Sequence, residues 1–352
     1  MLGKRYTYDG RPILRLNDLQ VEMKRQVDLK VLQGTYDFET VPCCICEGSD
    51  FDTLATKDRY GLYMPITICK DCGLVQTNPR MSQESYHQFY NCEYRKLYGG
   101  RERADAVFFD GQRRKGERIA KFLQRRGQWT PSHDSLVVEI GCGAGGILHH
   151  FRSLGCQVKG VDLGEEYVNF GKEQYGLDLL VGTVRDIEID RSPDVIIYSH
   201  VLEHILTPSH ELRTAAQILS DTGILYIEVP GLKNLMNSYD MDFLKYLQNA
   251  HSYHFTLTSL TNLASKSGLE VLVGTEDVFC IVGKSTRQKV DAPLINDYKA
   301  VIKYLHRVEW LRRISPVPLY KLKQMTVTIG LRLLKSLGLY EPVRRYFRGV
   351  SA

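Results

Sequence analysis

The stretch from Val137 to Gly146 reads V-V-E-I-G-C-G-A-G-G, and it decides the fold of this chain. Hydrophobic residues, interrupted by one acid at Glu139, run straight into a cluster of glycines. A buried strand followed by a turn with backbone angles that favour glycine would have this pattern. Such a turn lets a nucleotide-like ligand lie against the backbone, and the helix that follows offers unpaired N–H groups to it.

The bulk composition is that of a globular protein. The chain has 352 residues, of which 43% are hydrophobic and 25% charged, which suits one large domain with appendages or two domains. The net charge of +5 is too small to indicate nucleic-acid binding by itself. The N-terminus lacks the apolar segment of a signal peptide, and no window approaches the roughly 20 apolar residues of a spanning helix. We therefore expect a cytoplasmic protein, in which the nine cysteines are not disulfides.

Strand-like and helix-like segments alternate from Ser135 onward. Strands are expected at 136–140, 158–161, 179–181, 195–198, 224–229, 269–273 and 279–282, and helices at 146–154, 165–175, 208–219 and 258–267. This alternation predicts an α/β fold, a doubly wound, Rossmann-like and largely parallel sheet. The last two strands have no helix between them, which predicts a terminal antiparallel hairpin.

Changes in composition divide the chain into five expected parts. They are an N-terminal arm (1–40), which includes a helix near 16–32, a cysteine-rich unit (41–80), a helical connector or substrate lid (81–130), the α/β core (131–284) and a basic helical C-terminal region (285–352). Pro316 and Pro318 are expected to split the last part into two helical pieces.

The glycine cluster matches a dinucleotide-binding pattern. Gly141, Gly143 and Gly146 satisfy G-x-G-x-x-G, and Asp162 follows 21 residues after Gly141, where an acid could bind a ribose diol. The pattern alone leaves open a nicotinamide cofactor, another cofactor and a glycine turn with no ligand.

Three details favour a cofactor other than NAD. Glu139 stands two residues before the first glycine, where dinucleotide folds usually have small or apolar residues. The string E-I-G-C-G-A-G resembles motif I of the class I S-adenosylmethionine-dependent methyltransferases. The fourth expected strand then runs into S-H-V-L-E-H-I (199–205), a segment common in that superfamily, and the resemblance extends over about 135–283.

The resemblance implies which residues hold the cofactor. The methionine end would contact Glu139 and the glycine loop, the ribose hydroxyls would bond to Asp162, and the adenine would lie beside Leu163. Thr183 stands where the family most often has an acid for the adenine amino group, so Asp186 is the candidate there. The full expected set is Glu139, Gly141, Cys142, Gly143, Gly145, Asp162, Leu163, Asp186 and His200.

Two cysteine pairs predict a metal site. Cys43-x-x-Cys46 and Cys69-x-x-Cys72 are separated by 22 residues, and four thiolates complete a closed tetrahedral zinc site of structural type. The adjacent Cys44 could compete as a ligand, and the other interpretation is a set of reduced cysteines in a small core. A zinc unit before a class I core resembles methyltransferases that act on sugars or glycan intermediates, including deoxysugar C-methyltransferases.

Histidine is suited to proton transfer near neutral pH, and four histidines follow the fourth and fifth expected strands. A pocket histidine of the sugar methyltransferases aligns with His204, and the segment 250–255 resembles their substrate loop. C-methylating relatives have a Glu-His pair in this loop, whereas this chain has Ala250 before His251. The missing carboxylate favours O-methylation, with His251 and His204 as candidate bases. Each histidine, including His200 and His254, could instead be a structural hydrogen-bonding residue.

These observations predict a methyltransferase that O-methylates a sugar or glycan-related small molecule, with S-adenosylmethionine and structural zinc and without a nucleic-acid partner. A C-methyltransferase on a nucleotide-linked keto-sugar and a non-catalytic module that binds the cofactor and zinc are the alternatives. The basic C-terminal region predicts a solvated helical face, a homodimer contact, or a patch for a phosphorylated substrate or for peripheral contact with anionic lipids at the inner membrane face.

Overall fold

A seven-stranded sheet forms the upper half of the computed structural model, which describes residues 2–99, 105–285 and 293–315. Its strands are β6 (Leu136–Ile140), β7 (Gln157–Asp162), β8 (Leu179–Val181), β9 (Val195–Ser199), β10 (Ile224–Glu228), β12 (Leu269–Gly274) and β13 (Phe279–Lys284). The order is β12-β13-β10-β9-β6-β7-β8. Only β13 pairs antiparallel, with β10 and β12. The doubly wound sheet and its terminal hairpin are thus confirmed.

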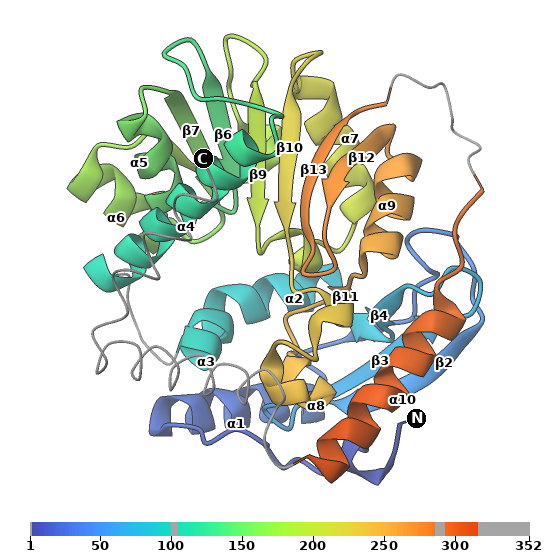
Figure 1. The fold of residues 1–352 in the computed structure, drawn as a ribbon. Helices are drawn as coiled ribbons and strands as arrows, with labels where there is room; N and C mark the ends of the chain where they lie inside the picture. The colour runs from blue at the N-terminus through green and yellow to red at the C-terminus, as the bar shows by residue number, and fades with distance from the viewer. Residues whose placement is uncertain (1, 100–104, 286–292, 316–352) are drawn as a thin grey trace, which may run out of the picture.

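Helices cover both faces of this sheet (Figure 1). The helices are α4 (Ala106–Arg125), α5 (Gly146–Ser153) and α6 (Glu165–Tyr175) on one face, and α7 (Pro208–Ile218) and α9 (Leu257–Lys266) on the other. Successive residues of one strand alternate between the two layers: Ile197 packs in the cluster of α4 to α6, and Ile196 in that of α7 and α9. Both faces are therefore buried, which explains the continuous hydrophobic runs of the central strands.

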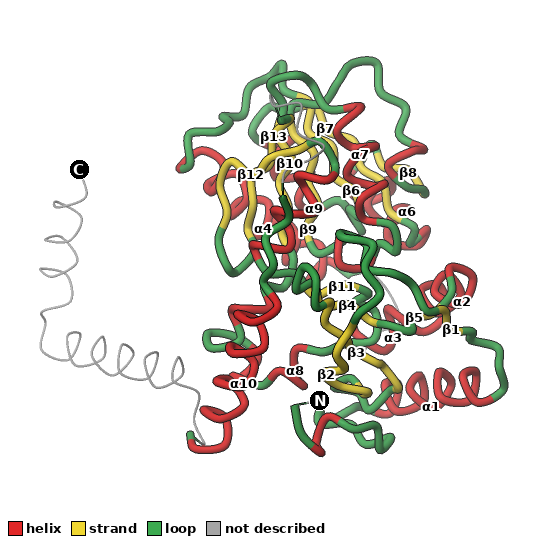
Figure 2. Tube along the Cα trace, turned by 90° about the vertical axis from the view of Figure 1, so that its right-hand side faces the viewer, coloured by secondary structure: helices red, strands yellow, loops and turns green. Residues whose placement is uncertain are grey.

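The N-terminal third forms a second sheet below the first (Figure 2). The short strands are β1 (Phe38–Glu39), β2 (Phe51–Lys57), β3 (Tyr63–Cys69), β4 (Val75–Thr77), β5 (Arg80–Met81) and β11 (Tyr253–His254). Strand β1 pairs with β5, and the other four form an antiparallel sheet in the order β11-β4-β3-β2. Since β11 belongs to the loop after β10, the sheet of the cysteine-rich unit contains a piece of the α/β core.

Helices complete the lower half. They are α1 (Asp18–Leu32), α2 (Gln83–Phe89), the π-helix η2 (Tyr90–Tyr94), α3 (Arg95–Gly99), α8 (Phe243–Tyr246) and α10 (Tyr298–Ile314). The 3-10 turns are η1 (Lys4–Tyr6), η3 (Val184–Asp186), η4 (Leu202–His204), η5 (Leu232–Asn234) and η6 (Tyr239–Met241).

Helix α10 begins the basic C-terminal region, and it is not a freely solvated element. Val301, Leu305 and Val308 are buried in one cluster with Met64 and Ile66 of β3. The expected division at Pro316 and Pro318 lies outside the described residues. Within 2–99, 105–285 and 293–315, no helix combines the length and the apolar character needed to cross a bilayer.

Candidate functional site: a cofactor loop facing a histidine cluster

The glycine loop has the backbone geometry that its sequence predicts. Gly141, Gly143 and Gly145 have φ of 67°, 54° and 77°, in the left-handed region. A Cβ atom on Gly141 would lie 2.3 Å from Cγ2 of Val201, so only glycine allows this close approach. The loop lies at the carboxyl end of β6, next to β9, where the direction of the strand order reverses. Open α/β sheets bind their ligands at this point.

Glu139 is a buried carboxyl group that lacks a complete set of partners. It is 1% exposed, and its Oε2 atom has no hydrogen-bond partner among the described residues. Burial, and then the nearby charge of Asp162, raises the pKa of Glu139 well above its usual value. A ligand with an ammonium group, such as the methionine end of S-adenosylmethionine, fits this orphaned acceptor.

Asp162 ends β7 and faces the glycine loop. Its two oxygens accept hydrogen bonds from the N–H groups of Gly143 (2.8 Å) and Gly164 (2.7 Å). Arg95 of α3 reaches the same carboxylate at 3.4 Å and stacks over the Tyr167 ring. The carboxylate is thus oriented by the backbone, and its site is contacted by the connector between the two halves.

The remaining expected cofactor residues differ in how accessible they are to a ligand. Leu163 is 47% exposed beside Asp162, open to a ligand. The Asp186 carboxylate accepts from the N–H of Thr183 at 2.7 Å and from its hydroxyl at 2.8 Å, so it caps its own turn. Cys142 is fully buried, and its carbonyl accepts from the Gln112 side chain of α4 at 3.0 Å.

Replacing Asp162 by asparagine tests the ribose site. The substitution keeps the shape but removes the charge, and a hydrogen bond to a charged group contributes about 1.5–3 kcal/mol. Calorimetry is expected to show roughly 10- to 100-fold weaker binding of S-adenosylmethionine. The matched control is Asp178→Asn, an exposed acid that directly precedes β8. Equal affinities in the two variants would mean that the ribose lies elsewhere.

The four predicted metal ligands come together. Sγ of Cys43 lies 3.4 Å from Sγ of Cys72, and the Cys46 and Cys69 sulfurs are also 3.4 Å apart. All four sulfurs lie within 4.8 Å of one another. Zinc–thiolate bonds of about 2.3 Å can span such a group, and four thiolates leave no open coordination position. Cys44 is not part of the group.

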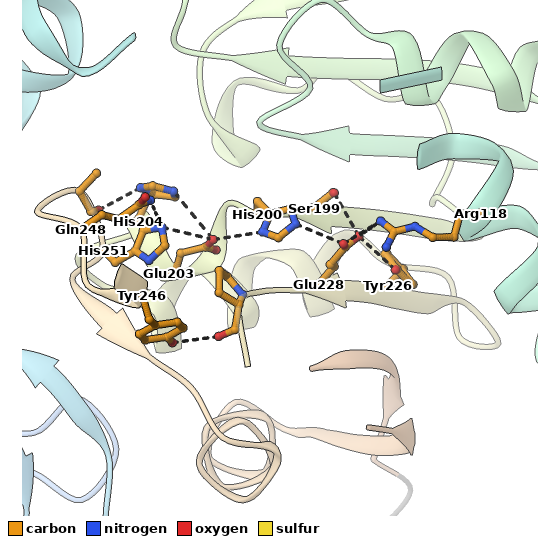
Figure 3. Close-up of polar contacts among 12 residues, drawn as sticks. Arg118, Ser199, His200, Glu203, His204, Tyr226, Glu228, Tyr246, Gln248 and His251 are labelled. Atoms are coloured by element: carbon orange, nitrogen blue, oxygen red, sulfur yellow. Dashed lines mark hydrogen bonds and ion pairs between the residues drawn. The ribbon is translucent and has the colours of Figure 1, made fainter. Parts of the chain in front are cut away.

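Three histidines surround one carboxylate at the carboxyl end of β9 (Figure 3). Oε1 of Glu203 lies 3.6 Å from Nδ1 of His200, 3.9 Å from Nε2 of His204 and 3.8 Å from Nε2 of His251. Both Glu203 oxygens are buried without a hydrogen-bond partner among the described residues. The glutamate, His204 and His251 are at most 8% exposed, so this is a water-poor histidine–carboxylate cluster.

The environment sets different charges on these histidines. Burial alone would lower the pKa of His200, but Glu203 and Glu228 together raise it to about 9. Burial, then the neighbouring His204 and His254, holds the pKa of His251 well below its usual value. His200 is therefore cationic near neutral pH, whereas His251 is neutral and able to accept a proton.

The other two expected histidines have more structural surroundings. Nδ1 of His204 donates to the Ala250 carbonyl at 2.9 Å, and the ring packs 5.6 Å from that of Tyr94. Burial lowers the pKa of His254 to about 3, and neither of its ring nitrogens has a hydrogen-bond partner among the described residues.

The expectation that His251 lacks a carboxylate partner is wrong. Residue 250 is alanine, but Glu203 faces the same imidazole from the loop after β9. Glu203 belongs to the S-H-V-L-E-H-I segment described above. Its contact with His251 could not be predicted from that segment, because His251 is distant in sequence. No comparable pattern pointed to Arg95 or to Glu228, which bonds to Arg118 at 2.7 Å and to His200 at 3.2 Å.

Comparison with known proteins agrees with this geometry. Residues 109–273 match the family model described as a methyltransferase domain. An uncharacterized methyltransferase of Staphylococcus carnosus is 29% identical over 124 residues, which cover 34% of this chain and 58% of that protein. A ubiquinone biosynthesis O-methyltransferase of Bradyrhizobium diazoefficiens is 28% identical over 96 residues, 26% of this chain and 38% of the relative. The chain thus spans less than two thirds of these curated relatives.

Among solved structures, magnesium protoporphyrin IX methyltransferase from Synechocystis PCC 6803 with bound SAH is 17% identical, with a TM-score of 0.40. The match covers 58% of this chain and all of that protein. The family match over 109–273 begins within α4 and ends within β12, so it falls on the seven-stranded sheet and the helices that cover it.

Proposed function

We propose that this chain is an S-adenosylmethionine-dependent O-methyltransferase that acts on a hydroxyl group of a sugar or glycan-related small molecule, with His251 as the general base. One observation carries the proposal. Nδ1 of His251 is buried, has no hydrogen-bond partner among the described residues, and belongs to an imidazole that is neutral near pH 7. The cluster that holds this unpaired basic nitrogen follows β9, the neighbour of β6 and its glycine loop, and such a nitrogen suits the removal of a hydroxyl proton.

The division of labour follows from the positions of the residues. When bound, S-adenosylmethionine supplies an electrophilic methyl group on a sulfonium. Glu139 and Asp162 would hold its two ends against the glycine loop. His251 would take the hydroxyl proton at Nδ1 as the oxygen attacks, and the buried surroundings would exclude water.

Two tyrosine rings beside the histidine cluster favour the proposal of a sugar-like acceptor. The rings of Tyr90 and Tyr94 stack with centroids 4.2 Å apart, and both contact the His204 ring. Flat apolar faces beside polar histidines match the C–H and O–H groups of a sugar ring. The resemblance of the cysteine-rich unit to sugar methyltransferases points the same way. The name of the Bradyrhizobium relative supports oxygen as the methylated atom.

C-methylation of a keto-sugar is the second candidate, and the Glu203–His251 contact of 3.8 Å favours it. A carboxylate beside a histidine is what the C-methylating relatives have. The absence of an acid at position 250 therefore does not separate the two reactions.

Methyl transfer from ¹³C-labelled S-adenosylmethionine to a panel of free sugars, sugar nucleotides and lipid-linked sugars tests the proposal. We expect a labelled product whose ¹³C chemical shift identifies an oxygen-bound methyl group. A carbon-bound methyl group would establish the second candidate. Cofactor binding without transfer to any member of the panel would favour the non-catalytic module.

The pH profile follows from the neutral state of the base. Because the pKa of His251 lies well below 6.5, kcat/KM is expected to be flat above about pH 6.5 and to fall only on the acid side. Measurement over about pH 5–9 with the identified acceptor checks this. An acid limb centred at or above pH 6.5 would point to another base.

Structural zinc in the four-cysteine group belongs to the proposal, with a role in stability rather than chemistry. Homodimer formation, peripheral membrane contact through the C-terminal region and a cytoplasmic location remain predictions.

A further inference from the structure

The base proposed above needs an anionic partner to stabilise its charge after proton transfer. In catalytic triads with a histidine base, a carboxylate on the far side of the imidazole fixes the tautomer and stabilises the imidazolium ion. Ala250 cannot do this, although the C-methylating relatives carry the acid at that position. The loop after β9 places Glu203 on the Nε2 side of His251, at 3.8 Å, opposite the unpaired Nδ1.

We propose that Glu203 is the positioning residue for His251. The ion-pair series His200–Glu228–Arg118 stabilises the negative charge of Glu203. This inference rests on the proposed function, since it concerns the same base. On proton transfer, the O–H bond of the acceptor breaks and a bond forms to Nδ1 of His251. The N–H at Nε2 then faces the carboxylate, and no co-reactant is required.

The charges of the side chains in this ion-pair series alternate in sign. Glu203 meets His200, His200 meets Glu228 at 3.2 Å, and Glu228 meets Arg118 at 2.7 Å (Figure 3). Burial alone would raise the pKa of Glu228, but His200 and Arg118 lower it to about 2. An isolated buried carboxylate is costly, whereas one that faces an imidazolium is compensated. The other groups around the cluster, His204, His254 and Arg59, carry no negative charge that could replace Glu203.

The backbone of His200 supplies a second observation. Its φ of 58° is unusual for a residue with a side chain, and its N–H donates to the Glu228 carbonyl at 2.8 Å. Such conformations are unfavourable and persist where the surrounding structure imposes them, often at functional sites. Here the conformation directs one imidazole toward two carboxylates.

The tautomer of His251 is the critical detail. The Gln248 side-chain amide also contacts Nε2, so this nitrogen could accept from the amide or donate to Glu203. A charged acceptor forms the stronger bond. The proposed role of Glu203 assigns the proton to Nε2 and the lone pair to Nδ1, which requires the Gln248 amide to turn its oxygen, rather than its nitrogen, toward Nε2–H. Glu203 and His251 lie 3.8 Å apart, and the same role requires this contact to shorten when the acceptor binds.

NMR of the full chain with ¹⁵N-labelled histidine tests the charge network without any acceptor. We expect the Nε2–H tautomer for His251 and a doubly protonated His200 at pH 7.5. Glu203→Gln keeps the volume but removes the charge, so the pKa of His200 should fall by at least one unit. The matched control is Glu211→Gln, a partly buried acid on α7 that bonds to Tyr198. An Nδ1–H tautomer of His251, or an unchanged His200 titration, would overturn the inference.

Kinetics with the acceptor identified by the panel provide the second readout. Glu203→Gln should lower kcat at least 100-fold and leave the KM for S-adenosylmethionine within threefold. His200→Asn should give a smaller loss, because asparagine tolerates the left-handed backbone. Unchanged kcat in Glu203→Gln would make the residue merely structural. The ligand atoms of Glu203, His204 and His251 lie within 4.8 Å of one another. If Glu203→Gln lost a metal ion that the four-cysteine group does not hold, these three residues would be a metal site and the inference would fail. Failure of the panel alone would count against the proposed function and leave the NMR result standing.

Discussion

Replacing His251 by asparagine is expected to lower kcat by about 10² to 10⁴, the usual contribution of a positioned general base. The side chain is 4% exposed and lies among other histidines rather than among cofactor-loop residues. S-adenosylmethionine should therefore bind with nearly unchanged affinity. Such a result would separate proton removal from cofactor binding, because only the first depends on the imidazole.

The matched control is His210→Asn, an exposed histidine on α7 that bonds to Arg185. Its kcat should equal that of the unmodified protein. Single-turnover transfer with saturating cofactor measures the chemical step directly. If His251→Asn retained more than a tenth of the activity, His204 would become the candidate base, since it is the other neutral histidine beside Glu203.

Local sequence patterns were sufficient to predict the α/β core. The run V-V-E-I-G-C-G-A-G-G predicts a strand, a glycine turn and the start of a helix within ten residues. The structure has β6, the left-handed glycines and α5 in these places. The alternation of strands and helices predicted the sheet for the same reason, since each element is encoded by its own periodicity. The four cysteines were predictable from spacing, because a metal knuckle is a local structure.

The acceptor half of the site was predictable only in part. His251 was visible as a candidate, but its relation to Glu203 joins positions 48 residues apart, through two loops that carry no periodic pattern. The pairing of β11 with β4 is similar, since a two-residue strand has no recognisable signal. Tertiary packing decides such contacts, and one sequence does not record it.

Strand β11 links the cysteine-rich unit to the proposed base. Its partner β4 follows Cys72 by three residues, and Thr77 at the end of β4 bonds to both residues before β11. The Thr77 hydroxyl donates to the His251 carbonyl, and its N–H donates to the Ser252 carbonyl, each at 2.9 Å. The unit that carries the four cysteines is therefore hydrogen-bonded to the backbone of His251 through Thr77.

Removal of the metal by Cys46→Ser is accordingly expected to stop methyl transfer more completely than it weakens cofactor binding. Apparent binding free energies of structural zinc in small domains are about 10–16 kcal/mol, so the unit should lose its fold without the ion. The cysteines and Leu74 share one cluster with Leu260 and Leu263 of α9, so the melting temperature of the core should fall as well. Glu139, Asp162 and the glycine loop lie in the other half and should still bind S-adenosylmethionine below that temperature.

The measurements are zinc per chain, melting temperature, calorimetric affinity for S-adenosylmethionine and the transfer rate. The matched control is Cys92→Ser, because Cys92 is exposed and lies outside the four-cysteine group. We expect one zinc ion in the control and less than one in Cys46→Ser, with transfer lowered more than 100-fold and cofactor affinity within about tenfold. A zinc-free protein with full transfer would show that β4 positions His251 without the metal. Cofactor binding lost in parallel with transfer would instead mean that zinc maintains the whole fold, because disruption of β4 and β11 alone leaves the glycine loop intact.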